Sequence, residues 1–237
     1  MNDARPPVLE ATGVVKHFVG GDGGDVRVLE GVTLAVHPGE IVAIVGASGA
    51  GKSTLLHVLG ALERPDAGAV RIGDARLDTL DDDALSDVRN RRIGFVFQFH
   101  HLLKEFSALE NVMMPLRIAG RSKADARTRA RDLLNRVGLS ARASHRPAEL
   151  SGGEQQRTAV ARALALEPSL LLADEPSGNL DQHTAEALHE LLSGLVADLG
   201  VGAVVVTHNR SLAARGHRVL LLADGHLTDT SLSEGAV

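Results

Sequence analysis

The stretch GASGAGKST, Gly46–Thr54, directly follows the apolar run IVAIV and fits the pattern G-x-x-x-x-G-K-[ST]. Phosphate oxygens need several convergent N–H donors, and glycines let a loop turn its backbone amides inward. A glycine-rich stretch can also be an ordinary turn, but the preceding strand and the GKST ending favour a phosphate-binding loop. The residues expected to bind nucleotide are Gly46, Ala47, Ser48, Gly49, Ala50, Gly51, Lys52, Ser53 and Thr54.

A helix beginning near Lys52 would add its positive dipole end to this loop. Lys52 is expected to reach the β- and γ-phosphates, and the Ser53 hydroxyl to bind Mg²⁺. The run LLLADEP is a second motif that complements the phosphate loop. Asp174 ends an apolar strand there, and its carboxylate can reach the same Mg²⁺. Glu175 follows at once and is the candidate general base for the attacking water. Acid pairs at strand ends also occur in plain turns, so this reading depends on the phosphate loop.

The composition is that of a soluble globular protein. The chain has 237 residues, of which 44% are hydrophobic and 23% charged, and its formal net charge is -5. No overall basic field exists to hold nucleic acid. Cysteine is absent, which excludes disulfides and thiolate metal sites and suits the cytosol. We expect neither a signal peptide at the start nor a membrane-spanning helix, because no apolar run approaches 18 residues.

The order of predicted elements indicates the fold class. Valine-rich strands are expected in the first third, and buried strands within residues 41–45, 169–174, 202–208 and 218–225, with helices dominating residues 107–165. The alternation of strands and helices predicts an α/β protein with a parallel sheet and a helical insertion. We find no internal repeat and no low-complexity segment.

The stretch ELSGGEQQR opens a further predicted helix. Ser151 is a natural N-cap, while Gly152 and Gly153 leave backbone amides accessible to an anion. The alternative is a capped helix with a flexible entry. The position of this stretch shortly before LLLADEPSGNLD favours an anion-binding role.

Taken together, these motifs resemble the ATP-binding cassette ATPases over nearly the whole chain. The elements that match, in the order of the family, are the phosphate loop, Gln98 after GFVF, the signature LSGGEQQR, LLLADE, SGNLD ending in Asp181, and His208 after AVVVT. The resemblance implies a P-loop core with an N-terminal antiparallel β subdomain and an inserted helical subdomain. Residues 1–237 would form a single nucleotide-binding domain, with a core lobe of about 1–97 and 166–237 and a helical lobe of about 98–165.

The same resemblance implies ATP and Mg²⁺ as cofactors and a head-to-tail homodimer around two ATP molecules. Glu175, His208 and Gln98 would be the catalytic residues, with Gln98 binding Mg²⁺ beside Ser53 and Asp174. The signature residues, which would meet the ATP of the opposite subunit, are Ser151, Gly152, Gly153 and Glu154, and Asp181 would lie in the D-loop. Phe18 occupies the place of the aromatic that stacks on adenine, although core packing at a strand end is the competing interpretation.

A narrower resemblance links FQFHHLLKEFSALENVMMPL to ATPases of lipoprotein-releasing exporters. It implies permease subunits of that type as partners, no nucleic acid, and a peripheral position on the cytoplasmic face of the bacterial inner membrane. The related alternatives are a macrolide or peptide exporter and the cell-division complex. Lys104 departs from the subfamily, where Pro is expected. A soluble two-cassette protein and a GTPase are disfavoured, since the chain is short and N-K-x-D is absent.

Four of the five phenylalanines fall in RIGFVFQFHHLLKEF, which contains Gln98. At least one of Phe95 and Phe97 is expected in the core. The residues expected to form an apolar seat for a membrane partner are Phe99, His100, His101, Leu102, Leu103 and Phe106. We do not expect a metal at the histidine pair, because adjacent residues of an extended segment point to opposite faces.

Overall fold

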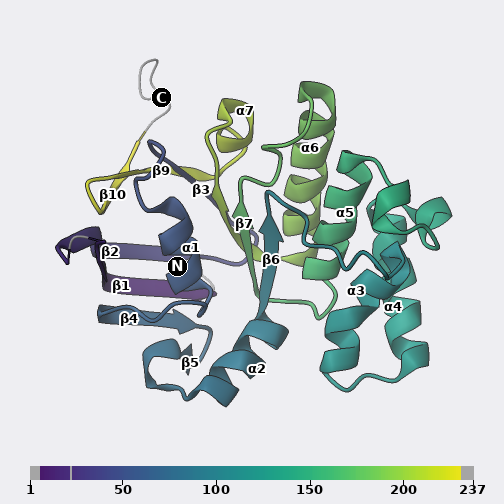
Figure 1. The fold of residues 1–237 in the computed structure, drawn as a ribbon, viewed down its shortest axis with the longest axis horizontal. Helices are drawn as coiled ribbons and strands as arrows, with labels where there is room; N and C mark the ends of the chain where they lie inside the picture. Colours follow the sequence, from purple (N-terminus) through teal and green to yellow (C-terminus); the bar gives the residue numbers. More distant parts are fainter. Residues whose placement is uncertain (1–5, 22, 231–237) are drawn as a thin grey trace, which may run out of the picture.

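Two sheets and a group of helices make up the fold of this computed structural model, which describes residues 6–21 and 23–230 (Figure 1). The strands are β1 (Leu9–Val19), β2 (Asp25–Val36), β3 (Ile41–Val45), β4 (Ala67–Ile72), β5 (Ala75–Arg76), β6 (Ile93–Phe97), β7 (Leu170–Asp174), β8 (Gly202–Val206), β9 (Arg218–Ala223) and β10 (His226–Asp229). The helices are α1 (Lys52–Leu59), α2 (Asp82–Arg92), α3 (Ala108–Ile118), α4 (Lys123–Arg136), α5 (Gly152–Ala163), α6 (Gln182–Leu199) and α7 (Arg210–Ala213).

The larger sheet has the strand order β10-β9-β3-β8-β7-β6. Its strands pair in parallel except for β10, which runs antiparallel to β9 at the edge. Every residue of β3 and β8 is buried, which explains why both read as continuous apolar runs. The predicted α/β fold with a parallel sheet is confirmed.

The pairing register brings the loops of the candidate site to one edge of this sheet. Ile44 of β3 lies beside Val206 of β8, Val206 beside Asp174 of β7, and Asp174 beside Phe97 of β6. These parallel strands all end within two residues of that row. The segments that follow them therefore emerge together at the carboxyl edge, where ligands of such sheets bind.

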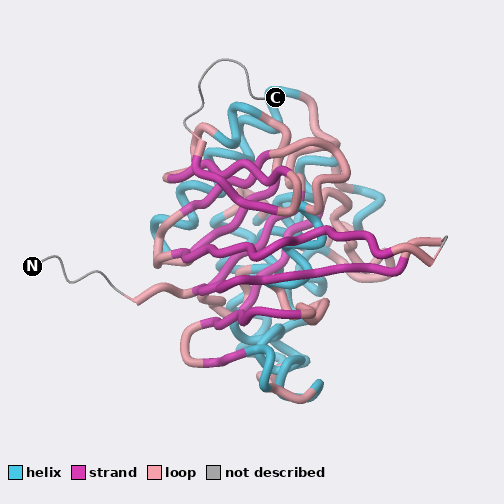
Figure 2. The backbone as a smooth tube through the Cα atoms, turned by 90° about the vertical axis from the view of Figure 1, so that its left-hand side faces the viewer, coloured by secondary structure: helices cyan, strands magenta, loops and turns pink. Residues whose placement is uncertain are grey.

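The smaller sheet is antiparallel, with the order β2-β1-β4-β5. Figure 2 shows its long β1 and β2 strands crossing the molecule as a hairpin. One apolar cluster joins this sheet to α1 and to one face of the larger sheet, with Leu9, Leu29, Leu55 and Leu59 fully buried. This cluster fixes the N-terminal strands against the strand that enters the phosphate loop.

A second apolar cluster joins α3, α4 and α5 to α6 and to the other face of the larger sheet. Fully buried members from α4 and α5 include Leu133, Leu134, Val160 and Ala161. The helical character predicted for residues 107–165 is confirmed as three helices with short 3-10 turns between them. The division into two lobes at residues 98 and 165 stays a prediction, because this cluster spans both. Within the described ranges, no helix combines the length and apolarity needed to cross a membrane.

Candidate active site

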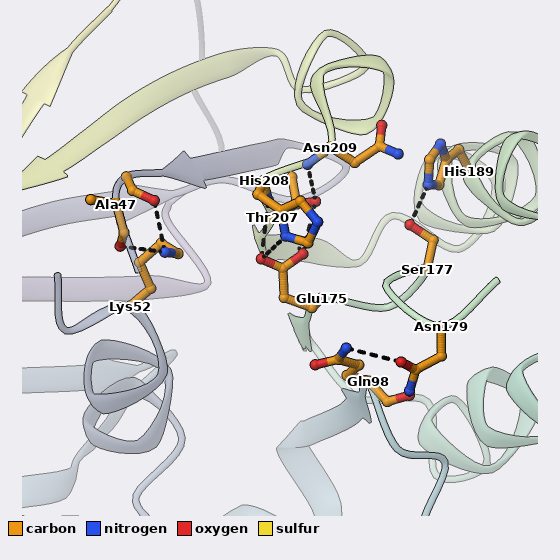
Figure 3. A network of polar contacts seen from close by, with 11 residues as sticks. Ala47, Lys52, Gln98, Glu175, Ser177, Asn179, His189, Thr207, His208 and Asn209 are labelled. Atoms are coloured by element: carbon orange, nitrogen blue, oxygen red, sulfur yellow. Dashed lines mark hydrogen bonds and ion pairs between the residues drawn. The ribbon is translucent and has the colours of Figure 1, made fainter. Parts of the chain in front are cut away.

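The phosphate loop runs from the end of β3 to the start of α1. The ammonium of Lys52 donates to the carbonyl oxygens of Gly46 and Ala47, each at 2.8 Å, and so ties the loop to itself (Figure 3). A side chain at Gly46 would collide with the carbonyl oxygen of Leu222, so the loop packs tightly against β9. A pocket of about 560 Å³ lies over this loop and the end of β9.

Glu175 follows β7, and its carboxylate is held by the loop after β8. The backbone N–H of His208 donates to Oε1 at 3.0 Å, and the His208 ring nitrogen Nδ1 lies 2.8 Å from the same oxygen. The Thr207 hydroxyl donates to Oε2 at 3.3 Å. Because a carboxylate accepts, the His208 Nδ1 carries the hydrogen. Three donors from two consecutive residues therefore orient this carboxylate, as Figure 3 shows.

The backbone of Glu175 is in the left-handed region, with φ of 44°. This conformation costs a non-glycine residue about 1–2 kcal/mol and persists only where surrounding contacts enforce it. Here the Glu175 N–H donates to the carbonyl of Val206 at 2.9 Å, and its own carbonyl accepts from Gly178 at 3.0 Å. The turn that aims the carboxylate is thus fixed on both sides.

Gln98 lies directly after β6, next to the end of β7. Its side-chain nitrogen donates to the Asn179 side-chain oxygen at 3.1 Å, and the Asn179 amide donates back to the Gln98 carbonyl at 3.2 Å. Asp174 is half-buried at the end of the neighbouring strand. The contact with Asn179 uses the amide nitrogen of Gln98, whereas a cation would use its oxygen, so both roles are compatible.

The signature stretch forms the N-terminus of α5. Ser151 is the N-cap, as predicted, and its hydroxyl accepts from the Glu154 N–H at 3.3 Å while the Glu154 carboxylate accepts from the Ser151 N–H at 2.8 Å. This hydrogen bond from the Ser151 backbone is the main reason that the pKa of Glu154 lies below its ordinary value, and Arg142 at 2.9 Å adds to it. The Glu154 carboxylate therefore serves the helix cap within its own subunit.

The D-loop leads into α6. Asp181 is the N-cap of that helix and accepts from the Thr184 hydroxyl at 2.6 Å and the Thr184 N–H at 3.1 Å, which lowers its pKa. A side chain at Gly153 would collide with the Thr184 methyl group. The start of the signature helix and the start of α6 are therefore in close contact.

Phe18 lies near the end of β1 and is 41% exposed, with the Lys16 ammonium 5.1 Å from its ring centroid. It pairs with Val26, two residues before Val28. Val28 in turn lies against the phosphate loop, because a side chain added at Gly51 would meet it at 2.7 Å. The ring is therefore exposed and outside the apolar core, and stacking on a base stays a prediction.

The tract from Phe99 to Phe106 exposes large apolar side chains. Phe99 is 66% exposed, Leu103 43% and Phe106 37%, while Leu102 and His100 are half-buried. A groove of about 260 Å³ lies beside it, and its apolar lining includes Phe95 and Phe97 of β6, Met114 and Ile118 of α3, Leu103 of the tract and Leu166 after α5. Phe95 packs against the core as predicted, and its ring stacks on Phe97 at 5.6 Å.

Three polar side chains, of which Asn111 and Gln156 are buried and Arg162 is half-buried, fix this tract to the helices. Arg162 of α5 donates to the carbonyls of His100 and His101 at 2.8 and 2.7 Å, and burial lowers its pKa. Gln156 of α5 donates to the Phe97 carbonyl at 3.0 Å. Asn111 of α3, fully buried, accepts from the Leu103 N–H and donates to the carbonyls of Leu103, Phe106 and Ser107. The signature helix is therefore hydrogen-bonded to the backbone at the start of the apolar tract.

The conformation expected for the histidine pair is wrong. His101 has a left-handed backbone with φ of 46°, and residues 100–103 have no regular structure, so the segment is not extended. The turn follows from Arg162, which gathers both carbonyls onto one guanidinium. Burial lowers the pKa of His100, opposed by the Gly152 backbone, while His101 and Arg162 lower it further. The described residues contain no group of three or more histidine, cysteine or acidic side chains able to hold a metal.

Sequence reasoning missed several residues that organise the site. Thr207 and Asn179 contact Glu175 and Gln98 directly, and Asn111, Gln156 and Arg162 hold the apolar tract. Thr207 gives a usable signal, because it is a polar residue between an apolar strand and a histidine. Asn179, Gln156 and Arg162 belong to polar helix or loop stretches in which nothing distinguishes them from solvated positions, whereas Asn111 is a polar residue on the buried side of the mainly apolar α3.

A glycine loop between the buried parallel strand β3 and a helix, with an acid pair at the end of β7, one strand further across the sheet beyond β8, defines a P-loop nucleoside triphosphatase. Residues 29–178 match the ABC transporter family, so the chain belongs to the ATP-binding cassette ATPases. The chain is therefore an ATP-hydrolysing enzyme.

Individual relatives agree with this assignment. The chain is 54% identical over 220 residues to a lipoprotein-releasing system ATP-binding protein of Geobacter metallireducens, covering 93% of this chain and 97% of that protein. It is also 54% identical over 225 residues to the protein of the same name from Ruegeria pomeroyi, covering 95% and 99%. A dimeric post-hydrolysis structure of the ATP-binding cassette MJ0796 bound to ADP and Pi superposes with a TM-score of 0.86 at 40% identity, covering 96% of this chain and all of that chain.

Proposed function

We propose that this chain hydrolyses ATP to drive the release of lipoproteins from the bacterial inner membrane. The support is the identity of about 54% to ATP-binding proteins of lipoprotein-releasing systems over more than nine-tenths of the chain. The structural observation that carries the proposal is the exposed apolar tract after Gln98, which an isolated enzyme does not need. The chain would act as a homodimer with permease subunits of the lipoprotein-releasing type, at the cytoplasmic face of that membrane.

ATP would lie along the phosphate loop with its base on Phe18. Two of the three hydrogens of the Lys52 ammonium are used by loop carbonyls, and the third is available for phosphate oxygens. The hard oxygen donors Ser53, Asp174 and Gln98 suit Mg²⁺, which prefers carboxylate and neutral oxygen ligands. Bound Mg²⁺ would neutralise charge on the phosphates. The loop glycines fit the group, because Gly46, Gly49 and Gly51 all have positive φ, a backbone conformation that lets the loop turn its amides towards an anion.

Glu175 would be the general base. Its carboxylate takes a proton from water as the water oxygen attacks the γ-phosphorus and the bond from that phosphorus to the β-bridging oxygen breaks, giving ADP and phosphate. The N–H of His208 and the hydroxyl of Thr207 hold the carboxylate in place. His208 would also donate to the γ-phosphate from Nε2, which requires a hydrogen on both ring nitrogens, since Nδ1 donates to Glu175.

A second subunit would complete each site. The α5 N-terminus, with Ser151, Gly152 and Gly153, offers N–H groups and a positive dipole end to an anion. A head-to-tail dimer would place this terminus over the partner's ATP with closed two-fold symmetry. Glu154 would contribute through the cap that orders this terminus, and Asp181 through the cap of α6.

The apolar tract would receive a helix of the permease. Its residues are Phe99, His100, His101, Leu102, Leu103 and Phe106. Arg162 and Gln156 connect the tract to the signature helix, so displacement of α5 when the dimer closes would move the docked helix. Gln98 directly precedes the tract in the chain and would transmit the state of the γ-phosphate to it.

Reconstitution would test the proposal. The chain and the permease subunits are placed in proteoliposomes loaded with an acylated lipoprotein, and ATP-dependent release to a soluble acceptor is measured. The matched control cargo is the same protein with its acylated cysteine changed to serine. Release of the acylated cargo alone supports the proposal. Stimulation of ATPase activity by a macrolide, with no release of lipoprotein, would instead identify the exporter alternative.

A further inference from the structure

His189 is a buried titratable residue that the proposed mechanism does not use. It lies in the middle of α6 with no exposed surface. The other buried residues of that helix are all apolar, namely Ala185, Leu188, Leu192, Leu195 and Val196. A buried imidazole is costly unless both nitrogens find partners. Both do: Nε2 lies 2.8 Å from the Ser177 hydroxyl and Nδ1 lies 3.3 Å from the Ser211 hydroxyl.

The direction of these hydrogen bonds follows from Asn209. Its side-chain oxygen accepts from the backbone N–H groups of Ser211 and Leu212 at 2.9 and 3.1 Å, which identifies the oxygen of the amide. The Ser211 hydroxyl donates to that same oxygen at 2.8 Å, so it must accept from His189. His189 is then neutral with its hydrogen on Nδ1, and Nε2 accepts from the Ser177 hydroxyl.

The two ends of this hydrogen-bond chain lie in the two segments that hold Glu175. Ser177 is two residues after Glu175, in the turn with the left-handed backbone. At the other end, the Asn209 N–H donates to the Thr207 hydroxyl at 2.9 Å, and that hydroxyl donates to the Glu175 carboxylate. The contacts therefore close a ring from Glu175 through Ser177, His189 and the loop after β8 back to Glu175, most of which is visible in Figure 3.

We propose that His189 is a positioning residue for ATP hydrolysis. It fixes the distance between the turn that carries Glu175 and the loop that carries His208, so that the carboxylate stays aimed at the attacking water. His189 contacts neither ATP nor the water, and its effect passes through Ser177 and Ser211. The inference concerns the ATPase reaction itself and holds whatever cargo the transporter releases.

The helix-packing explanation makes a different prediction. If His189 only filled space, an apolar residue of similar size would serve at least as well, as it does at every other buried position of α6. Gln, by contrast, carries an acceptor and a donor spaced like the two ring nitrogens, and it does not titrate. The pair His189→Leu and His189→Gln therefore separates packing from positioning.

The test measures steady-state ATP hydrolysis, ATP binding and thermal unfolding of the full chain. His189→Leu is expected to lower kcat about tenfold, the equivalent of one well-formed hydrogen bond, with KM and ATP affinity close to wild type. His189→Gln should restore most of kcat. Ser193→Ala is the matched control. The Ser193 hydroxyl donates to the backbone carbonyl of His189 on the same helix, but it contacts neither the turn that carries Glu175 nor the loop that carries His208. It should leave kcat unchanged.

Ser177→Ala breaks the same chain of hydrogen bonds without changing a residue of α6, so it tests the proposal even if His189→Leu does not fold. It should lower kcat as His189→Leu does. The double variant Ser177→Ala with His189→Leu should be little worse than either single variant, since each substitution alone already interrupts the hydrogen bonds. Wild-type kcat in folded His189→Leu or in Ser177→Ala would overturn the proposal. So would additive losses in the double variant, or a His189→Gln variant as slow as His189→Leu.

Discussion

Truncation of Phe99 measures what the apolar tract contributes to docking. Phe99 is 66% exposed, so a partner that covers the ring removes about 130 Å² of its roughly 200 Å² from water. At about 25 cal/mol per Å² this amounts to about 3 kcal/mol. That figure is an upper value for a ring that becomes fully covered, and it corresponds to about a hundredfold in Kd. We expect Phe99→Ala to weaken docking to the permease between tenfold and a hundredfold.

Phe18→Ala is the matched control, because it removes an identical ring that is 41% exposed on a different strand. The assay titrates each variant onto permease subunits in lipid nanodiscs and, separately, onto ATP. Phe99→Ala should lose docking and keep ATP affinity, whereas Phe18→Ala should do the reverse. Both should melt near wild type, since neither ring is buried.

A Phe99→Ala variant that docks to the permease like wild type would refute the proposal that the apolar tract is the docking site. A large loss of thermal stability would refute it as well, because truncating a core phenylalanine costs about 3–5 kcal/mol and an exposed one far less. The tract would then be part of the core, and the partner would bind elsewhere.

Four further outcomes are expected. Lys52→Ala should abolish ATP binding, measured by equilibrium titration, because the loop loses its two internal hydrogen bonds as well as the charge; normal ATP affinity would contradict the assigned loop. Glu175→Gln should retain ATP, nearly stop hydrolysis and accumulate a dimer in size-exclusion chromatography with Mg-ATP, and a variant that stays monomeric while binding ATP would count against the shared site. Asn111→Leu should cost about 3–4 kcal/mol in urea unfolding, because four hydrogen bonds in a buried turn are lost; a loss below about 1 kcal/mol would show that the tract is held by other contacts. Burial and Arg215 lower the pKa of His189, and Glu186 opposes them, so stability should be complete above about pH 6.5 and fall as the unfolded chain binds the proton below it; His189→Gln should reduce this fall in unfolding measured from pH 7 to 5.5.

The sequence predicts the sheet and the phosphate loop well because both have strong local signals. The runs at β3 and β8 are apolar without interruption, which only a strand buried on both faces requires. Helix α2 escaped prediction because DDALSDVRNRR has only Leu85 and Val88 buried, too few for a clear 3.6-residue period. Asp81, which caps it, is one of several aspartates in a row and gives no distinct signal.

The contacts between motifs could not be predicted, since they join segments far apart in the chain. Gln98 and Asn179 are 81 residues apart, and nothing in either stretch announces the pair of hydrogen bonds between them. The turn at His101 is set by Arg162, 61 residues later in the chain. The residues next to His101 give no sign of this contact, so the sequence around it predicts an extended segment. Residue identities in a motif indicate chemistry, whereas relative position comes from packing that only the folded chain displays.

The left-handed backbone at Glu175 has a consequence for how this enzyme can change over evolutionary time. Glycine adopts that conformation freely, so Glu175→Gly would relieve backbone strain of about 1–2 kcal/mol. It would also lose the hydrogen bonds that the carboxylate accepts from Thr207 and His208, at about 0.5–1.5 kcal/mol each. The two effects are of similar size, so stability alone does not hold glutamate at this position. A screen that rewards survival at high temperature without monitoring turnover should therefore tolerate glycine or asparagine at residue 175, and the chains that carry them should be folded but lack the proposed base.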